Sequence, residues 1–122
     1  MHKTREETRA FFRRFLSLYQ PTSTQHVHTL IAPPYTSIET ALGMARNTPL
    51  WIGAQNVHHE EQGAFTGEIS MPMLQDLGVH FVIVGHSERR KYFQETDSVI
   101  ARKLHRVLDA GLWAILCVGE TR

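Results

Sequence analysis

Four short apolar runs, rich in β-branched residues, alternate along the chain with segments whose apolar residues recur at helical spacing. Such alternation is typical of parallel βαβ units, because consecutive parallel strands need a helical crossover. The third run is almost continuously apolar, as a parallel strand covered on both faces should be. The sequence therefore predicts an α/β fold, one domain over residues 1–122, with strands at residues 26–32, 50–57, 79–85 and 113–119.

The first and last helices carry terminal signals. Thr4 and Glu7 have the spacing of a capping box, and Pro21 is expected to stop the helix that follows. One apolar stripe then recurs at helical spacing: Phe11, Phe12, Phe15, Leu16 and Tyr19. It could be a surface for a partner helix, but packing against the sheet is the commoner reason for such a stripe. Residues 96–110 form the last helix, with Gly111 in the left-handed position after it.

Two shorter helices are expected in the middle of the chain. Residues 36–39 repeat the capping-box pattern and open a helix that runs to about Arg46. Ser70 and Pro72 suit the cap and first turn of a brief helix, which Gly78 closes. Both helices lie between predicted strands, as βαβ units require.

Composition argues against several function classes. The net charge is +1 and the basic residues are scattered, so a nucleic-acid partner has little support. No apolar stretch is long enough to span a bilayer and the N-terminus lacks a signal-peptide core, so we expect no membrane partner. A single cysteine, Cys117, cannot form an internal disulfide and fits the reducing cytoplasm, where we expect the protein to be located.

Signals for metal or cofactor binding are weak. The loop His58-His59-Glu60-Glu61 contains metal-ligating residue types, but neighbouring side chains on a flexible loop rarely point at one ion. No strand is followed by a glycine-rich dinucleotide fingerprint or a P-loop. We therefore expect a solvated loop, no metal site and no cofactor.

The strongest local signal is Gly85-His86-Ser87-Glu88-Arg89-Arg90, at the end of the third strand. Active sites of α/β folds collect at the carboxyl ends of parallel strands. Ser87 can begin a helical turn, whose positive end disfavours the imidazolium form of His86. A neutral imidazole at this place can donate a hydrogen bond to a substrate carbonyl and stabilise an enediolate.

Several motifs together closely resemble triosephosphate isomerase: Pro33-Pro34-Tyr35, Gly53-Ala54-Gln55-Asn56, residues 63–70, Gly85-His86-Ser87-Glu88-Arg89-Arg90, residues 92–97 and residues 115–121. The resemblance implies a partial (β/α)8 TIM barrel of four strands and four helices, which correspond to strands two to five of the family. It also implies the interconversion of dihydroxyacetone phosphate and glyceraldehyde 3-phosphate, in glycolysis and gluconeogenesis, without a cofactor. The use of a neutral histidine is already established for triosephosphate isomerase itself.

Site roles follow from the resemblance residue by residue. His86 would be the electrophile that faces the substrate carbonyl, and Ser87 and Glu88 would support it. Cys117 would be the family's buried strand cysteine, or equally a small core residue. The residues expected in a loop that inserts into the neighbouring subunit are Phe65, Thr66, Gly67 and Glu68.

The family's catalytic lysine and glutamate base have no counterpart among these residues. Lys3 aligns with the entry to the first helix, and neither Glu88 nor Glu120 takes the position of the base. We therefore expect the chain to be inactive, or nearly so, by itself. A non-catalytic half-barrel that self-assembles, and an enzyme that takes the missing residues from a second polypeptide, are the alternatives.

Assembly follows from the strand count. Four parallel strands cut from an eight-stranded barrel leave open edges at residues 26–32 and 113–119, which invite pairing with another chain. An apolar inner face would also be exposed, formed by Ile31, Ile52, Ile83 and Ile115 or their neighbours. We expect a homodimer or larger, either closed into one eight-stranded barrel or packed face to face.

Overall fold

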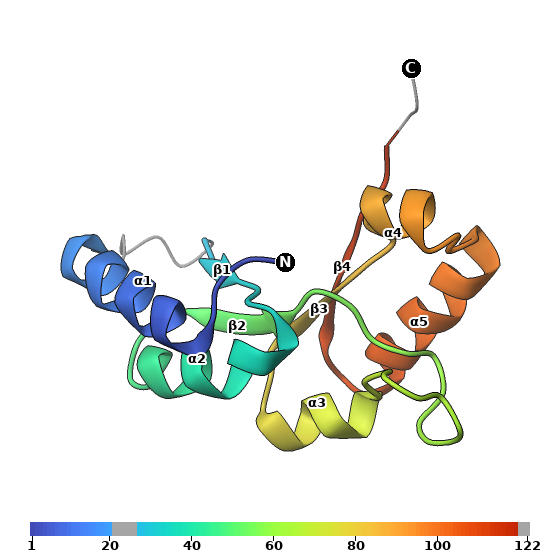
Figure 1. Ribbon diagram of the computed structural model, residues 1–122, viewed down its shortest axis with the longest axis horizontal. Helices are drawn as coiled ribbons and strands as arrows, with labels where there is room; N and C mark the ends of the chain where they lie inside the picture. Colours follow the sequence, from blue (N-terminus) through green and yellow to red (C-terminus); the bar gives the residue numbers. More distant parts are fainter. Residues whose placement is uncertain (21–26, 120–122) are drawn as a thin grey trace.

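A computed structural model describes residues 1–20 and 27–119, and shows one sheet with helices packed against it (Figure 1). Every strand pairing is parallel, and the order across the sheet is the order along the chain. The strands are β1 (Leu30–Ile31), β2 (Trp51–Ala54), β3 (Phe81–Val84) and β4 (Trp113–Leu116). The predicted α/β fold with parallel βαβ units, a partial TIM barrel, is confirmed.

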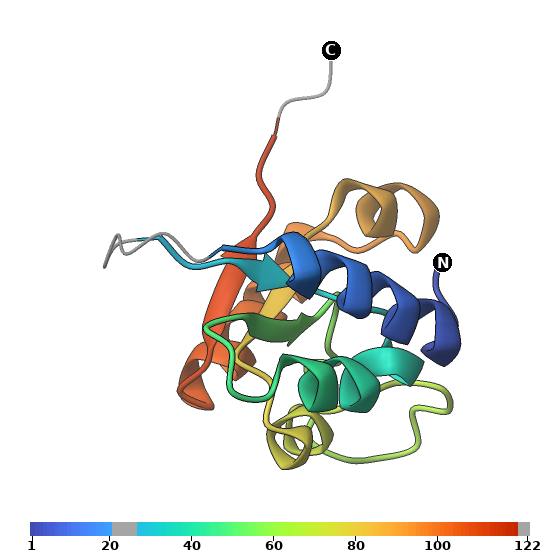
Figure 2. The same cartoon turned by 90° about the vertical axis from the view of Figure 1, so that its left-hand side faces the viewer.

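Helices precede and connect the strands, as Figure 2 shows from the side. They are α1 (Arg5–Leu18), the 3-10 helix η1 (Tyr35–Ser37), α2 (Ile38–Ala45), α3 (Met71–Leu77), α4 (Ser87–Tyr92) and α5 (Asp97–Asp109). The count of four helices was too low, because the turn expected at Ser87 continues into α4. None of the described helices has the length and apolarity needed to span a membrane.

Most of the predicted helix ends are confirmed. Thr4 and Glu7 form the capping box that begins α1, with the Thr4 N–H donating to the Glu7 carboxylate at 2.6 Å. Gly78 and Gly111 adopt φ angles of 81° and 73°, the left-handed conformation in which glycine costs least. Pro21, the expected stop, lies outside the described residues.

The second capping box was wrong. The backbone enters η1 directly after Pro34, and the Ser37 side chain makes no cap hydrogen bond with α2. Its hydroxyl instead donates to the Lys3 carbonyl at 3.4 Å, which ties this turn to the start of α1. A tertiary contact has replaced the local cap.

All four strands are shorter than expected, since β3 and β4 also end before residues 85 and 119. Residues 26–32 pair with β2 only over Leu30–Ile31, and His26 lies outside the described residues. The second strand ends at Ala54, where residues 55–57 leave the sheet. Paired length depends on the neighbouring strand, which the sequence of one strand cannot specify.

One face of the sheet is buried under the helices. Ile52 packs with Phe12 of α1 and with Ala41 of α2, and all three are fully buried. Val82 and Val84 on β3 face the second cluster, which α3 and α5 complete. The stripe on α1 therefore serves core packing, as expected.

The opposite face is the inner face of the half-barrel, and in this chain it stays partly exposed. Parallel register places Phe81 beside Trp113, and Ile83 beside Ile115. Trp113 is 65% exposed and Leu30 is 40% exposed. Ile83 and Ile115 are only half-buried, as expected of inner-face residues.

The assignment of Ile31 and Ile52 to the inner face was wrong. Leu30 and Trp51 are neighbours in register and lie on the inner face, so Ile31 and Ile52 point to the helices. A shift of one residue reverses the face of every side chain in a strand. Both runs are apolar without clear alternation, so the sequence did not show which of their residues face the helices.

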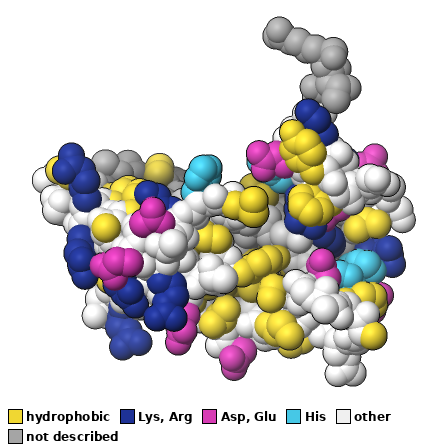
Figure 3. Space-filling view, in the orientation of Figure 1, with side chains coloured by type: hydrophobic (Ala, Val, Ile, Leu, Met, Phe, Trp, Pro, Cys, Tyr) yellow, Lys and Arg dark blue, Asp and Glu magenta, His cyan; other side chains and the backbone are white. Residues whose placement is uncertain are grey.

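Aromatic rings cross the inner face near the amino-terminal ends of the strands. The Trp51 ring centroid lies 4.2 Å from that of His28, 5.8 Å from that of His80 and 5.6 Å from that of Trp113. In Figure 3 hydrophobic side chains gather across the middle of the molecule, whereas Lys and Arg gather over the α1 side. Together these partly exposed rings form a large apolar surface, and surfaces of this kind commonly mark interaction sites.

Phe12 and Phe11 offer a matched test of the buried stripe. Phe12→Ala should lower the free energy of unfolding by about 3 to 5 kcal/mol, because the fully buried ring leaves a cavity. Phe11→Ala removes the same side chain from a position 39% exposed, and should cost about 1 kcal/mol. Urea unfolding measures both, and equal losses would contradict the described packing.

Candidate active site

His86 lies where the sequence predicted, at the carboxyl end of β3, with only Gly85 between them. It is the N-cap residue of α4, and its Nδ1 accepts the backbone N–H of Glu88 at 3.3 Å. The side chain is 46% exposed. Because Nδ1 is occupied as an acceptor, the neutral ring carries its proton on Nε2, which leaves one N–H free to donate.

Gly85 makes the turn that presents His86. Its φ angle is 76°, a conformation that other residues rarely adopt. A Cβ here would lie 3.2 Å from Ile100 and 3.3 Å from the Cys117 carbonyl oxygen. The end of β4 is this close because the Cys117 N–H donates to the Val84 carbonyl at 2.9 Å.

Ser87 and Glu88, the other predicted site residues, lie beside His86 on the first turn of α4. Glu88 Oε2 is 3.6 Å from His86 Nδ1, and the Glu88 side chain is 73% exposed. An open depression of about 720 Å³ lies next to them, lined by Gly85, His86, Ser87, Arg90, Lys91, Cys117, Val118 and Gly119. Arg90 and Lys91 are its cationic lining residues, and Arg90 is paired with Asp97 Oδ1 at 2.5 Å. Glu120 lies outside the described residues.

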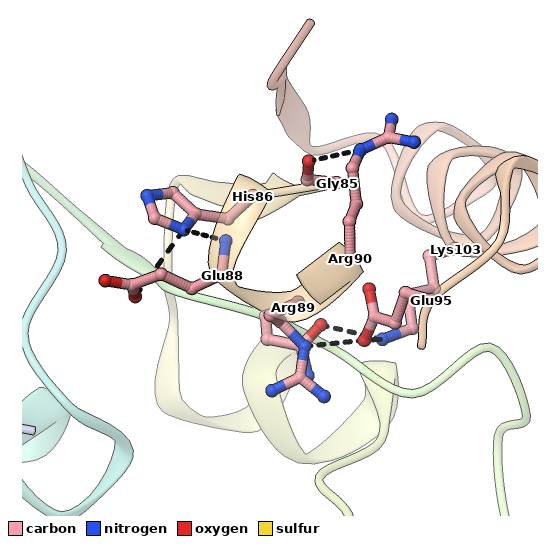
Figure 4. A network of polar contacts seen from close by, with 8 residues as sticks. Gly85, His86, Glu88, Arg89, Arg90, Glu95 and Lys103 are labelled. Atoms are coloured by element: carbon pink, nitrogen blue, oxygen red, sulfur yellow. Dashed lines mark hydrogen bonds and ion pairs between the residues drawn. The ribbon is translucent and has the colours of Figure 1, made fainter. Parts of the chain in front are cut away.

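The helix that carries His86 has no hydrophobic anchor, since none of the α4 residues is buried. Two neighbouring arginines connect it to the rest of the chain instead (Figure 4). Arg89 Nε donates to the Glu95 carboxylate, and Arg90 Nε donates to the Gly85 carbonyl at 2.9 Å. The position of α4 therefore depends on polar contacts.

Glu95 is the centre of a buried network that sequence analysis missed. Its Oε1 accepts from Arg89 Nε and from Lys103 Nζ, each at 2.5 Å. Lys103 Nζ also donates to Asn56 Oδ1 at 2.8 Å, which links α5 to the end of β2. A signal was present, because Lys103 lies between Ile100 and Val107 on the buried face of the last helix.

Burial and hydrogen bonding act in opposite directions on the network. Burial would raise the pKa of the Glu95 carboxyl, but the hydrogen bonds from Lys103 and Arg89 outweigh it and hold the pKa below its usual 4.5. Burial lowers the pKa of Lys103 despite the hydrogen bond to Glu95. The stability that ionised Glu95 contributes is therefore complete above pH 4.5 and lost as the pH falls through its lower, folded-state pKa.

The predicted subunit-contact loop lies between β2 and α3, away from α4 in both ribbon views. Phe65, Thr66, Gly67 and Glu68 are exposed, and their part in a subunit contact stays a prediction. The Phe65 ring packs at a tilt against that of His58, with 4.3 Å between centroids. The structure thus keeps this loop and His86 apart within one chain.

The histidine–glutamate segment next to that loop does not converge on one point. His58 and His59 stack ring on ring, and Glu61 accepts from Arg106 at 2.7 Å. Burial lowers the pKa of His59. Over residues 1–20 and 27–119, no three His, Cys, Asp or Glu side chains come close enough to hold a metal ion.

Lys103→Met should reduce the free energy of unfolding by about 3 to 5 kcal/mol, because it leaves Glu95 buried without its main cation. The matched control is Arg9→Met, which breaks an exposed pair with Glu6 at 3.0 Å and should cost less than about 1 kcal/mol. Urea unfolding at neutral pH compares them. A Lys103 variant no less stable than the Arg9 variant would show that the network does not stabilise the fold.

The comparison with known proteins agrees with this geometry. The family model described as triosephosphate isomerase matches residues 1–122. Similar curated relatives, each named triosephosphate isomerase, come from Gloeobacter violaceus (50% identical, covering 99% of this chain and 49% of the relative), Solibacter usitatus (48%, 98% and 47%) and Aquifex aeolicus (47%, 100% and 49%). The chain thus spans about half the length of these relatives, and it belongs to the triosephosphate isomerase family.

Proposed function

We propose that the chain supplies the histidine part of a site that interconverts dihydroxyacetone phosphate and glyceraldehyde 3-phosphate. The observation that carries this proposal is the position of His86, at the carboxyl end of β3 with Nδ1 engaged by Glu88 N–H. The free Nε2–H would donate to the substrate carbonyl oxygen and stabilise the enediolate. Ser87 and Glu88 support it by forming the turn that His86 caps.

The charge of the depression suits a phosphorylated substrate. Arg90 and Lys91 line it together with His86, while Glu88 is directed to the Nδ1 side of the ring. Phosphate groups are recognised by guanidinium and ammonium groups of this kind. The reaction needs no cofactor, because a proton moves between neighbouring carbons without an external oxidant.

These residues do not by themselves provide a base for proton abstraction. Of the other described carboxylates that contact α4 or its arginines, Glu95 is buried and held by Arg89 and Lys103, and Asp97 is paired with Arg90. A positioned base contributes about 10² to 10⁴-fold to such a reaction. We therefore propose that the 122-residue chain is inactive, or nearly so, without further segments.

The expected result for the purified chain is no isomerisation of dihydroxyacetone phosphate above that of the His86→Ala variant. A coupled assay for glyceraldehyde 3-phosphate measures this at high enzyme concentration. Turnover in the wild type that disappears in the variant would contradict inactivity. It would then favour a second copy of the chain as the source of the missing groups.

The exposed inner face favours a second candidate function, a non-catalytic module that self-assembles. Parallel sheets are normally covered on both faces, and here Trp113 and Leu30 remain in contact with solvent. We propose that two copies associate into a homodimer through this face. In a closed arrangement the free edge of β4 pairs with β1 of the second copy, which gives eight parallel strands.

Light scattering at micromolar concentration should give at least twice the chain mass of 14.0 kDa. Trp113→Lys should shift the protein towards monomer, because it places a charge in the proposed interface. Leu108→Lys, on α5 and 53% exposed, is the control that should keep the dimer. A wild-type mass of 14.0 kDa across the micromolar range would refute association in either arrangement.

We also propose a cytoplasmic location and no nucleic-acid partner. Cys117 is a free, half-buried thiol, which fits a reducing compartment. The net charge of +1 gives little attraction for a polyanion.

A further inference from the structure

The orientation of His86 has to be set by something other than hydrophobic packing. His86 caps α4, and α4 contributes no buried residue to either core cluster. Helices usually gain most of their stability from a buried apolar face. A six-residue helix without such a face is held by its polar contacts, and two arginines make those contacts in different places.

Arg90 hydrogen-bonds to Gly85, the residue that precedes His86. Its Nε donates to the Gly85 carbonyl at 2.9 Å, and its Nη1 donates to Asp97 Oδ1 at 2.5 Å. Its Nη2 lies 3.3 Å from the place where a Gly85 Cβ would be. The guanidinium is a planar fork, so two contacts from one side chain fix its orientation as well as its position.

Holding the Gly85 carbonyl also orients His86. The peptide between Gly85 and His86 is planar, so the direction of the Gly85 C=O sets the direction of the His86 N–H. Gly85 has φ 76° and no side chain, and glycine is the residue with the most alternative conformations at such a turn. A hydrogen bond that removes those alternative conformations therefore also fixes the orientation of His86.

We propose that Arg90 is a positioning residue for His86, which holds the Gly85–His86 peptide so that Nδ1 meets the Glu88 N–H and Nε2–H stays free. The proposal deepens the proposed function, because it rests on His86 as the site histidine. Arg89 has a different role, since its partner Glu95 belongs to the buried network that stabilises the fold. Of the two adjacent arginines, Arg90 thus orients His86 and Arg89 stabilises the fold.

The test uses NMR of the full chain, labelled with ¹⁵N, at neutral pH and without substrate. In the wild type the His86 ring should be a single tautomer protonated on Nε2, and the Glu88 amide should show a hydrogen-bonded shift. Arg90→Met should average the two tautomers and move the Glu88 amide. Core resonances, such as those around Phe12, should remain unchanged.

Arg106 offers a matched control. Its Nε donates to the His59 carbonyl at 3.1 Å and its Nη1 to Glu61 at 2.7 Å, the same pattern of contacts at another place. Arg106→Met should leave the His86 tautomer as in the wild type. If Arg106→Met averaged it as well, the effect would be non-specific and the proposal would be overturned.

Arg90→Lys keeps the charge and covers the case in which Arg90→Met does not fold. Lysine lacks the fork, so His86 should again lose its single tautomer. A wild-type ring signature in either folded variant would overturn the proposal. This readout requires no turnover, so it is independent of the isomerase assay, whose failure would instead count against the proposed function.

Discussion

The structure depends on one constraint, a parallel sheet that its own helices cover on only one side. On the covered side Ile52 and Val82 are fully buried against α1, α2, α3 and α5. On the inner side the Trp51 ring contacts those of Trp113, His28 and His80, and Trp113 remains 65% exposed. Apolar area left in water costs about 25 cal/mol per Å², which favours any partner that removes it.

The way in which His86 is held also reflects this partial barrel. At the carboxyl edge of the sheet, where a complete barrel would surround the ligand, His86 stands on a helix with no apolar anchor. Polar contacts hold this helix instead. Arg90 hydrogen-bonds at the strand end, and Arg89 binds Glu95, which also accepts from Lys103. Stability and orientation are therefore both electrostatic here, and sensitive to single substitutions.

Helix caps and strand ends could be predicted from the sequence, whereas strand register and long-range ion pairs could not. Thr4, Gly78 and the strand end before His86 follow from residue types at short range, and the structure has them where the sequence indicated. The face on which Ile52 lies depends on register with a neighbouring strand, so uniform apolarity left it open. Lys103 was overlooked because its partner Glu95 precedes the helix, although a lysine on an apolar helix face signals a buried ion pair.

We propose that the inner face of the half-barrel is an interface between copies of the chain, and the tryptophans report on it directly. Both of its tryptophans, Trp51 and Trp113, lie on that face. Tryptophan emission and acrylamide quenching, followed while the protein is diluted from micromolar to nanomolar concentration, measure how accessible the face is. We expect protected, blue-shifted emission at high concentration that becomes red-shifted and quenchable on dilution. Emission that is red-shifted and equally quenchable at every concentration would contradict it.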